Sequence, residues 1–200
     1  MVSYWENWRK FMNKSKSLKI ALYVRVAGII LLFACFFIPF AAALTLSSGS
    51  VHTTYGSFFS FIFSGNISNG KVSYAAKGLS VLCLIGFIFL FVAFVLLVST
   101  LFIKKNTSVL KALLVLASIL LVITSAILLV SSHKSLATVL ADTLIKGHSD
   151  AVTTTVYNNT NIQFGVWGTA TFEFLSSLCL LSSLLLDGSF DRIRAKIGLF

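Results

Sequence analysis

Hydrophobic residues in this chain gather into four long runs that polar segments separate. The two clearest runs cover residues 78–103 and 109–131, and only the short segment 104–108 joins them. Each run exceeds the roughly 20 residues with which an α-helix crosses a hydrocarbon core about 30 Å thick. Because the join is so short, the two runs predict an antiparallel helical hairpin in a membrane, around which the other elements are arranged.

Two further apolar runs, residues 20–46 and 164–186, predict a first and a fourth span. Pro39 lies in the outer half of the first span, where its missing backbone donor predicts a kink. The fold class that we expect is therefore an all-α membrane protein. It is a four-helix transmembrane bundle that forms a single domain over residues 1–200.

The segment between the first two spans, residues 47–77, is strongly aromatic. Its apolar run 58–63 is too short to cross the membrane, and exposed to water it would be a sticky surface. We therefore expect this loop to be covered within the protein, immersed in lipid or used to hold a partner protein. The candidate partner contacts are Tyr55, Phe58, Phe59, Phe61 and Phe63.

The two outer loops predict a small extracellular cap. In the first loop, β-forming residues at 51–55 and 71–74 predict a short hairpin. The second loop, residues 132–163, has helical apolar spacing over 136–145 and a β-branched run over 151–157 that predicts one strand beside the hairpin. The N-glycosylation acceptor pattern, which loops rich in Asn, Ser and Thr match by chance, occurs at Asn66 and Asn158.

Residues 1–18 predict an amphipathic helix on the inner membrane surface. Aromatic residues recur at helical spacing on one face and basic residues take the others, which is typical of an interfacial helix. A docking helix for a partner protein is the alternative. Residues 187–200 predict a short amphipathic tail on the same side of the membrane. The candidate membrane-surface anchors are Trp5, Trp8, Arg9 and Lys10.

Charge sets the predicted orientation. The chain is 57% hydrophobic and only 11% charged, yet it carries a formal net charge of +10. Lysine and arginine concentrate in the N-terminal segment, around the 104–108 join and after the last span, which the positive-inside rule assigns to the cytoplasm. We therefore expect a multi-pass protein of the plasma membrane with both termini cytoplasmic. Because anionic lipid explains the basic excess, the lipid bilayer is an expected partner and nucleic acid is not.

Glu173 is the charged residue that we expect deepest inside a span. Intramembrane carboxyls are expensive and usually face the bundle interior, so they are candidates for function. One interpretation is a proton or cation site or a ligand contact. The others are a protonated carboxyl bonded to hydroxyls of a neighbouring helix, and a contact to a partner subunit. Arg25 should lie nearer the opposite membrane face and is not an expected partner. The predicted polar stripe around Glu173 comprises Thr169, Ser176 and Ser177, and the third span offers the small hydroxyl residues Ser118, Thr124 and Ser125.

Signals for catalysis are absent from the sequence. No nucleophile or phosphate-binding motif occurs. The histidines stand in or beside outer loops without a second ligand at metal-binding spacing: His52, His133 and His148. The cysteines each fall in an apolar run, which favours buried small side chains over disulfides: Cys35, Cys83 and Cys179. We therefore expect no catalytic residue, cofactor or metal, and no enzyme.

The aromatic run of residues 55–65, Tyr-Gly-Ser-Phe-Phe-Ser-Phe-Ile-Phe-Ser-Gly, stands just before the second span. It resembles a segment in small uncharacterised bacterial four-span membrane proteins. The plan of cytoplasmic ends, a strand-bearing first outer loop and a short inner hairpin resembles that of claudin-like tetraspan proteins. The claudin signature, a Trp-Gly-Leu-Trp motif with two loop cysteines, is missing from residues 47–77, so no pore or junction residue carries over. The resemblance implies an adhesion, scaffold or accessory role.

Three functional hypotheses remain. The first is a non-enzymatic integral membrane interaction protein, an accessory or scaffold subunit of a complex with another membrane protein or with itself. The second is a small permease or channel component that uses Glu173. The third is an immunity or stress protein that blocks a toxin or a pore.

Overall fold

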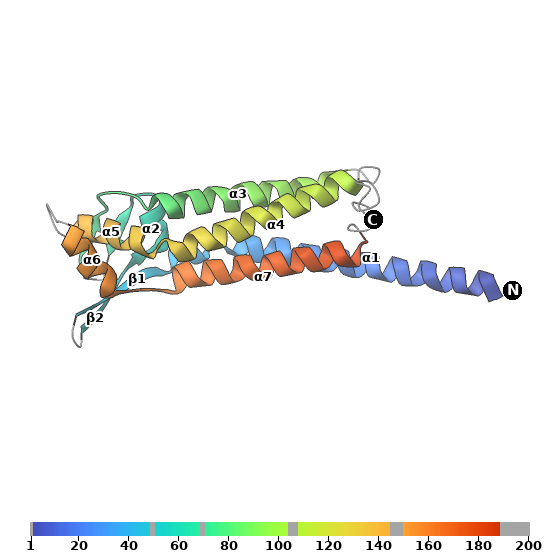
Figure 1. Ribbon diagram of the computed structural model, residues 1–200, viewed down its shortest axis with the longest axis horizontal. Helices are drawn as coiled ribbons and strands as arrows, with labels where there is room; N and C mark the ends of the chain where they lie inside the picture. The colour runs from blue at the N-terminus through green and yellow to red at the C-terminus, as the bar shows by residue number, and fades with distance from the viewer. Residues whose placement is uncertain (1, 49–50, 69–70, 104–107, 145–149, 189–200) are drawn as a thin grey trace.

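The computed structural model of the chain describes residues 2–48, 51–68, 71–103, 108–144 and 150–188, and for residues 2–15, 48, 51, 108 and 150–153 it describes the backbone alone. The described part is an elongated helical bundle with a small cap of strands and short helices at one end (Figure 1). We call this end the cap end. The opposite end, beyond which α1 begins, is the terminal end.

Four helical segments are each long and apolar enough to cross a membrane, as the sequence predicts. The second, third and fourth predicted spans match helices of the bundle to within a few residues. The bundle helices are α1 (Val2–Ala34), α3 (Val81–Phe102), α4 (Ser108–Ser131) and α7 (Phe164–Leu186).

Helix α1 corrects the predicted N-terminal segment. The expected surface helix of residues 1–18 and the start of the first span form one continuous helix, whose N-terminal part extends past the other bundle helices (Figure 1). Residues 2–27 contain neither Pro nor Gly, so nothing in the sequence interrupts helical hydrogen bonding there. The predicted surface anchors lie in this helix, and their side chains fall outside the described part: Trp5, Trp8, Arg9 and Lys10.

Pro39 ends the first span instead of kinking it. After α1 the backbone tightens into turns, and Pro39 stands in η1 (Ile38–Phe40), a short 3₁₀-helix whose first turn suits the fixed φ and missing donor of proline. Strand β1 (Ala42–Ser48) follows directly. The predicted span boundary at residue 46 is therefore wrong, because the chain is already extended there, and the apolar helical segment ends by Phe40.

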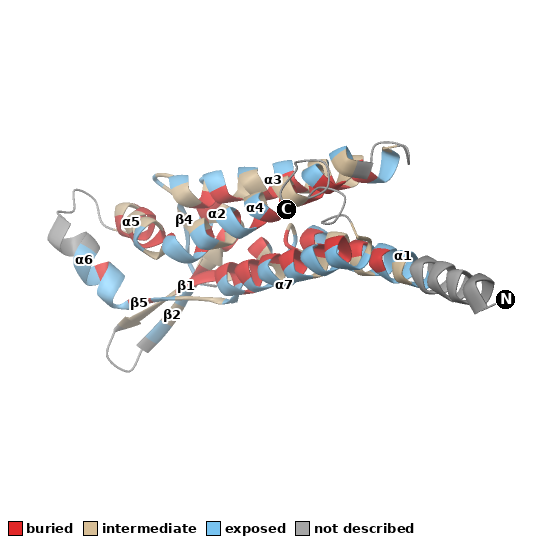
Figure 2. Cartoon of the chain, turned by 45° about the vertical axis from the view of Figure 1, so that its right-hand side comes forward, coloured by how far each residue is buried: buried red, intermediate tan, exposed pale blue. Residues whose placement is uncertain are grey.

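Helix α7 is the middle member of the bundle. It packs against α1 on one side and α4 on the other, and α4 packs in turn against α3. Buried faces of these helices point towards one another and exposed faces point outward (Figure 2). Glycines bring the backbones close: a Cβ on Gly28 of α1 would lie 3.2 Å from Cys179 Cβ, and one on Gly86 of α3 would lie 3.3 Å from Leu129 Cδ2. Such close packing supplies the attraction that the hydrophobic effect cannot supply between helices in lipid.

Phenylalanine rings bridge the remaining side of the bundle, between α1 and α3. The ring centroids of Phe33 and Phe94 are 5.9 Å apart, and Phe36 lies 5.5 Å from both Phe87 and Phe94. Ring pairs at these separations stabilise a contact beyond the area that they bury. The aliphatic core behind them is formed by Leu32, Leu90, Leu97, Val115, Val122 and Leu180.

The cap contains a three-stranded antiparallel sheet in the order β2-β1-β5. Strand β2 (Val51–Ser57) forms a hairpin with β1, and β5 (Thr160–Ile162) pairs along the other edge of β1. A second hairpin and three short helices complete the cap: β3 (Asn66–Ser68), β4 (Ser73–Ala75), α2 (Phe58–Ile62), α5 (His133–Leu144) and α6 (Asp150–Asn158). Its apolar core includes Leu44, Phe58, Phe61, Ile62, Leu136 and Leu140.

The cap confirms a predicted helix and corrects the predicted strands. The helix expected over residues 136–145 is α5. Residues 51–55 pair with β1 and not with 71–74, because the preceding strand closes a hairpin over a shorter loop. The β-branched run 151–157 is helical, and the strand that pairs with β1 is β5, just after this run. Packing context can override β-propensity, which is a weak guide on its own.

Gly165, in the first turn of α7, joins the bundle to the cap and gives a test of the fold. A Cβ at this position would lie 2.6 Å from the Ala42 carbonyl oxygen and 2.7 Å from that of Ala41. Because backbone atoms of a sheet cannot yield as a flexible side chain can, we expect Gly165→Ala to lower the free energy of unfolding by about 1–3 kcal/mol. Unfolding of the purified protein in detergent measures this change. Gly78→Ala is the control, because a Cβ there meets no atom within 4 Å, and equal stability of the two variants would contradict the tight contact.

Candidate functional site

Glu173 lies in the middle of α7 with its side chain fully buried, at 0% exposure. The buried face of α7 that carries it is polar along its length, although the helix is apolar enough to span a membrane. The predicted companions of Glu173 all lie on this face. The buried polar residues of α7 are Thr169, Glu173, Ser176, Ser177 and Ser183.

The carboxyl of Glu173 reaches across to α4 and, through it, to α3. Glu173 Oε1 lies 2.9 Å from Ser125 Oγ, and the same Ser125 Oγ lies 2.8 Å from the carbonyl oxygen of Gly86. Both distances are those of hydrogen bonds. Three polar groups from three helices therefore meet inside the bundle. The sequence marks Ser125 only as one of several small hydroxyl residues and gives no sign of Gly86.

The second carboxyl oxygen of Glu173 has a different environment. Glu173 Oε2 is buried and has no hydrogen-bond partner among the residues that the structure describes. A buried polar atom without a partner is uncommon in folded proteins and calls for a specific explanation. The carboxyl is thus the chemically distinctive group of the bundle interior.

The predicted companions of Glu173 divide into two kinds. Thr169 and Ser177 donate to carbonyl oxygens of their own helix, at Gly165 and Glu173, over 2.6 and 3.0 Å. Ser176 instead donates to the Gly28 carbonyl oxygen of α1 over 2.8 Å. The polar stripe therefore surrounds the carboxyl along the helix without hydrogen bonding to its oxygen atoms, and Ser176 serves the contact between α7 and α1.

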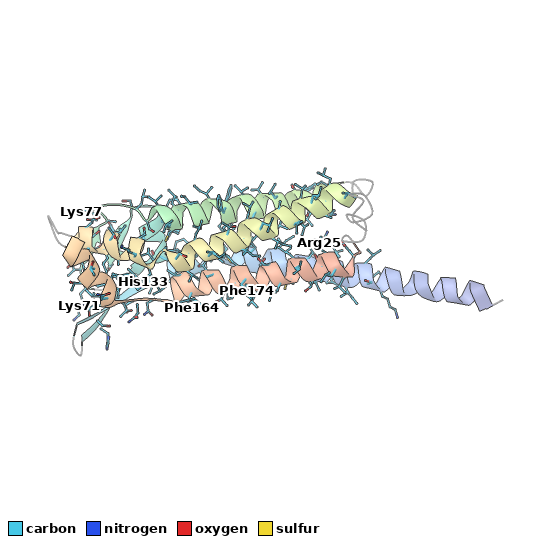
Figure 3. All side chains as sticks on the ribbon, in the orientation of Figure 1. Arg25, Lys71, Lys77, His133, Phe164 and Phe174 are labelled. Carbon is cyan, nitrogen blue, oxygen red and sulfur yellow. The ribbon has the colours of Figure 1, made fainter. Side chains whose placement is uncertain are left out.

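Arg25 pairs with an acid at the terminal end of the bundle. Its Nη2 lies 2.7 Å from Asp187 Oδ2, and its Nε donates to Ser183 Oγ over 3.3 Å. Figure 3 shows Arg25 near the end of α7, while His133 lies at the opposite, cap end. Asp187 follows the last residue of α7, and Gly188 takes a left-handed φ of 66° that ends the helix. The ion pair ties α1 to α7, and Arg25 does not neutralise Glu173.

The aromatic candidates for partner contact are only partly at the surface. Tyr55, Phe58 and Phe61 are buried in the cap core, so for these three rings the structure favours the alternative that the loop is covered within the protein. Helix α2 turns two of them inward beneath the sheet. Phe63 is 48% exposed and Phe59 is half-buried. Phe59 stacks on the exposed ring of Phe40, with centroids 5.1 Å apart, and lies 4.5 Å from Phe63.

His133, the first residue of α5, contacts residues at the end of α6 and the start of β5. Its Nε2 lies 3.0 Å from Thr160 Oγ1, and its ring centroid lies 4.6 Å from that of Tyr157. Burial lowers the pKa of His133, and a hydrogen bond with the backbone of Thr160 opposes this shift. The ring thus connects α5 to β5, the strand at one edge of the sheet.

The described residues contain no cluster of three or more His, Cys, Asp or Glu side chains that could bind a metal ion. Cys35 and Cys83 are buried as free thiols, and Cys179 is partly buried. Cys35 Sγ lies 3.4 Å from the Leu31 carbonyl oxygen and 3.8 Å from that of Thr169, at the contact between α1 and α7. These thiols act as small packing groups between helices.

Comparison with known proteins adds no family to this description. The sequence matches no protein-family model, and a search of curated proteins gives no match. Function is therefore inferred from the residues of this chain, and the resemblance to claudin-like tetraspan proteins stays an expectation.

Ser176 offers a test of how hydroxyl groups hold this bundle together. Ser176→Ala removes the buried donor to Gly28, so we expect the free energy of unfolding to fall by about 1 kcal/mol. Denaturant or thermal unfolding in detergent measures the change. Ser182→Ala, at an exposed position of the same helix, should leave stability unchanged. A similar loss in both variants would contradict a specific contribution from the hydrogen bond between helices.

Proposed function

We propose that this chain is a non-enzymatic interaction protein of the plasma membrane, an accessory or scaffold subunit that binds a transmembrane helix of a different membrane protein. The observation that carries the proposal is a groove of about 400 Å³ on the outer surface of the bundle, between α4 and α7. The groove lies in the cap-side half of both helices. Its lining residues are Ala126, Ile127, Val130, Ser131, Trp167, Ala170, Thr171 and Phe174.

The shape and chemistry of the groove favour a helix as its occupant. Ala126 and Ala170 give it small side chains from both helices, while Ile127 and Phe174 stand as exposed walls. Small residues beside larger ones allow the backbone of another transmembrane helix to approach closely. Thr171 adds a hydroxyl that already donates to the Trp167 carbonyl oxygen over 2.8 Å, so its oxygen can still accept a hydrogen bond.

The arrangement of charges supports the proposed orientation in the membrane. Arg25 and Lys111 belong to the terminal end, together with the basic residues of the N-terminal segment. Figure 3 shows Lys71 and Lys77 at the cap end, where basic residues are fewer. The positive-inside rule then places the terminal end in the cytoplasm and the cap outside. In this orientation the groove faces the outer leaflet.

Filling the groove tests the proposal. Ala126→Leu places a larger side chain in it, so we expect a membrane protein that co-purifies stoichiometrically with the native chain in mild detergent to lose at least tenfold in recovery, which corresponds to about 1.4 kcal/mol of binding energy. Mass spectrometry of the affinity-purified protein measures the recovery. Ala117→Leu is the control, because Ala117 is half-buried on the same helix and lies outside the groove. Purification of the chain alone or as a homo-oligomer would contradict the proposal, and so would equal recovery with both variants.

A small permease or channel component that uses Glu173 is the second candidate function. The buried Oε2 atom, unpaired among the described residues, favours it, because intramembrane acids mark proton and ion pathways in many transporters. On this hypothesis Glu173→Gln abolishes pH-dependent flux in proteoliposomes, since an amide cannot release a proton. Undiminished flux in the variant would remove Glu173 from any transport mechanism.

A further inference from the structure

We infer that Glu173 carries its proton in the folded bundle, and that this proton completes a hydrogen-bond relay from α7 through Ser125 on α4 to the Gly86 carbonyl on α3. The carboxyl is then a proton-binding site in a hydrogen-bond chain that connects three helices. This inference does not depend on the groove or on any partner protein. It follows from counting the hydrogens that the three polar groups can supply.

The hydroxyl of Ser125 carries a single hydrogen. Its Oγ lies within hydrogen-bond distance of two oxygens, Gly86 O at 2.8 Å and Glu173 Oε1 at 2.9 Å. A carbonyl oxygen and an ionised carboxylate oxygen can only accept. With an ionised Glu173 one of the two contacts would therefore have no hydrogen between its oxygens.

A protonated carboxyl satisfies both contacts. Glu173 Oε1–H then donates to Ser125 Oγ, and Ser125 Oγ–H donates to the Gly86 carbonyl oxygen. Each pair of oxygens then has one hydrogen between them. The two oxygen–oxygen distances agree to within about 0.2 Å with the 2.7–2.8 Å typical of O–H···O bonds. Oε2 becomes the carbonyl oxygen of a neutral acid. Burying a neutral oxygen without a partner costs far less free energy than burying a charged carboxylate oxygen without one.

Among the residues that the structure describes, no charged group near Glu173 would hold it ionised. Arg25 is engaged with Asp187, which lies fourteen residues along α7, or about 21 Å at 1.5 Å per residue. Lys111 of α4 interacts with Arg25 and Asp187 at the same terminal end. Cys35, just beyond α1, interacts electrostatically with Glu173, and its protonated thiol carries no charge that could stabilise a carboxylate. On α3 the described titratable group is Cys83, which interacts with Ser80 and Ser132 at the cap end.

Loss of the proton would weaken the hydrogen bonds that connect the three helices. Ser125 would have one hydrogen for two acceptors, and a carboxylate would stand in a site with 0% exposure. Gly86 of α3 packs closely against α4 at this level, where a Cβ on it would lie 3.3 Å from Leu129 Cδ2 and 3.5 Å from the Ser125 carbonyl oxygen. The protonation state of one side chain therefore bears on the contact of α7 with α4 and, through Ser125, on the hydrogen bond of α4 to α3.

Infrared spectroscopy of the purified protein in lipid nanodiscs at neutral pH tests the assignment. We expect the carbonyl stretching band of a protonated carboxylic acid in the native protein and its complete loss in Glu173→Gln. The chain has one other glutamate, Glu6, which the variant keeps, so the difference spectrum reports position 173. Loss of carboxylate bands in the variant, without loss of the acid band, would overturn the inference.

A pair of serine variants on α4 tests the relay itself and covers the case in which Glu173→Gln does not fold. Ser125→Ala removes the acceptor of the Glu173 proton, so we expect the acid band to shift to the frequency of a carboxyl without a hydrogen-bonded hydroxyl. Ser118→Ala is the control, because Ser118 is equally buried and donates within its own helix to the Leu114 carbonyl oxygen over 2.8 Å. An unshifted acid band in Ser125→Ala, or the same shift in both variants, would overturn the relay.

Discussion

The contacts of α7 with α1 and α4 are the constraint on which the rest of the bundle depends. Between helices in lipid there is little hydrophobic attraction, so close packing and hydrogen bonds must hold them. Helix α7 meets this requirement on both sides: Ser176 donates to the Gly28 carbonyl of α1, and Glu173 meets Ser125 of α4. Helix α3 joins indirectly, through α4. Without α7, α1 would meet the other helices chiefly through phenylalanine rings.

Both ends of α7 are held by contacts that differ in chemistry. At the cap end, the Gln163 amide just before α7 donates to the Ala43 carbonyl of β1 over 2.8 Å, and Gly165 lets the helix start against the same strand. At the terminal end, the Arg25–Asp187 ion pair ties α7 to α1, and Ser17 adds a hydrogen bond to the Leu186 carbonyl. In the proposed membrane orientation this ion pair would lie near the surface, where a long side chain can keep its charge close to the headgroups. Backbone bonds to a strand suit the cap, where the sheet supplies acceptors.

Sequence reasoning predicts what depends on composition along the chain and misses what depends on neighbours in space. The four apolar helices follow from the length of their apolar runs, and α5 follows from its helical periodicity. The β-branched run at 151–157 misleads, because β-propensity depends on packing context and the strand that pairs with β1 is formed by residues 160–162. Glu173 is found because a carboxyl in an apolar run stands out. Its partners are not found, because a glycine carbonyl has no signature in sequence and Ser125 looks like its neighbours Ser118 and Thr124.

What separates Ser125 and Ser176 from the other hydroxyls is the glycine opposite each of them. Ser118, Thr124, Thr169, Thr171 and Ser177 donate to carbonyl oxygens of their own helices, which is the default where nothing lies within reach. At Gly86 and Gly28 the missing side chain lets a neighbouring helix come close enough for its hydroxyl to bond across, at 2.8 Å in both cases. For these two hydroxyls inside the bundle, the glycine opposite is what allows a bond between helices. Glu173 has a hydroxyl partner on α4 for its proton only because Gly86 brings Ser125 into that role, so the chemistry of the carboxyl is set by a residue on a helix that it does not touch directly.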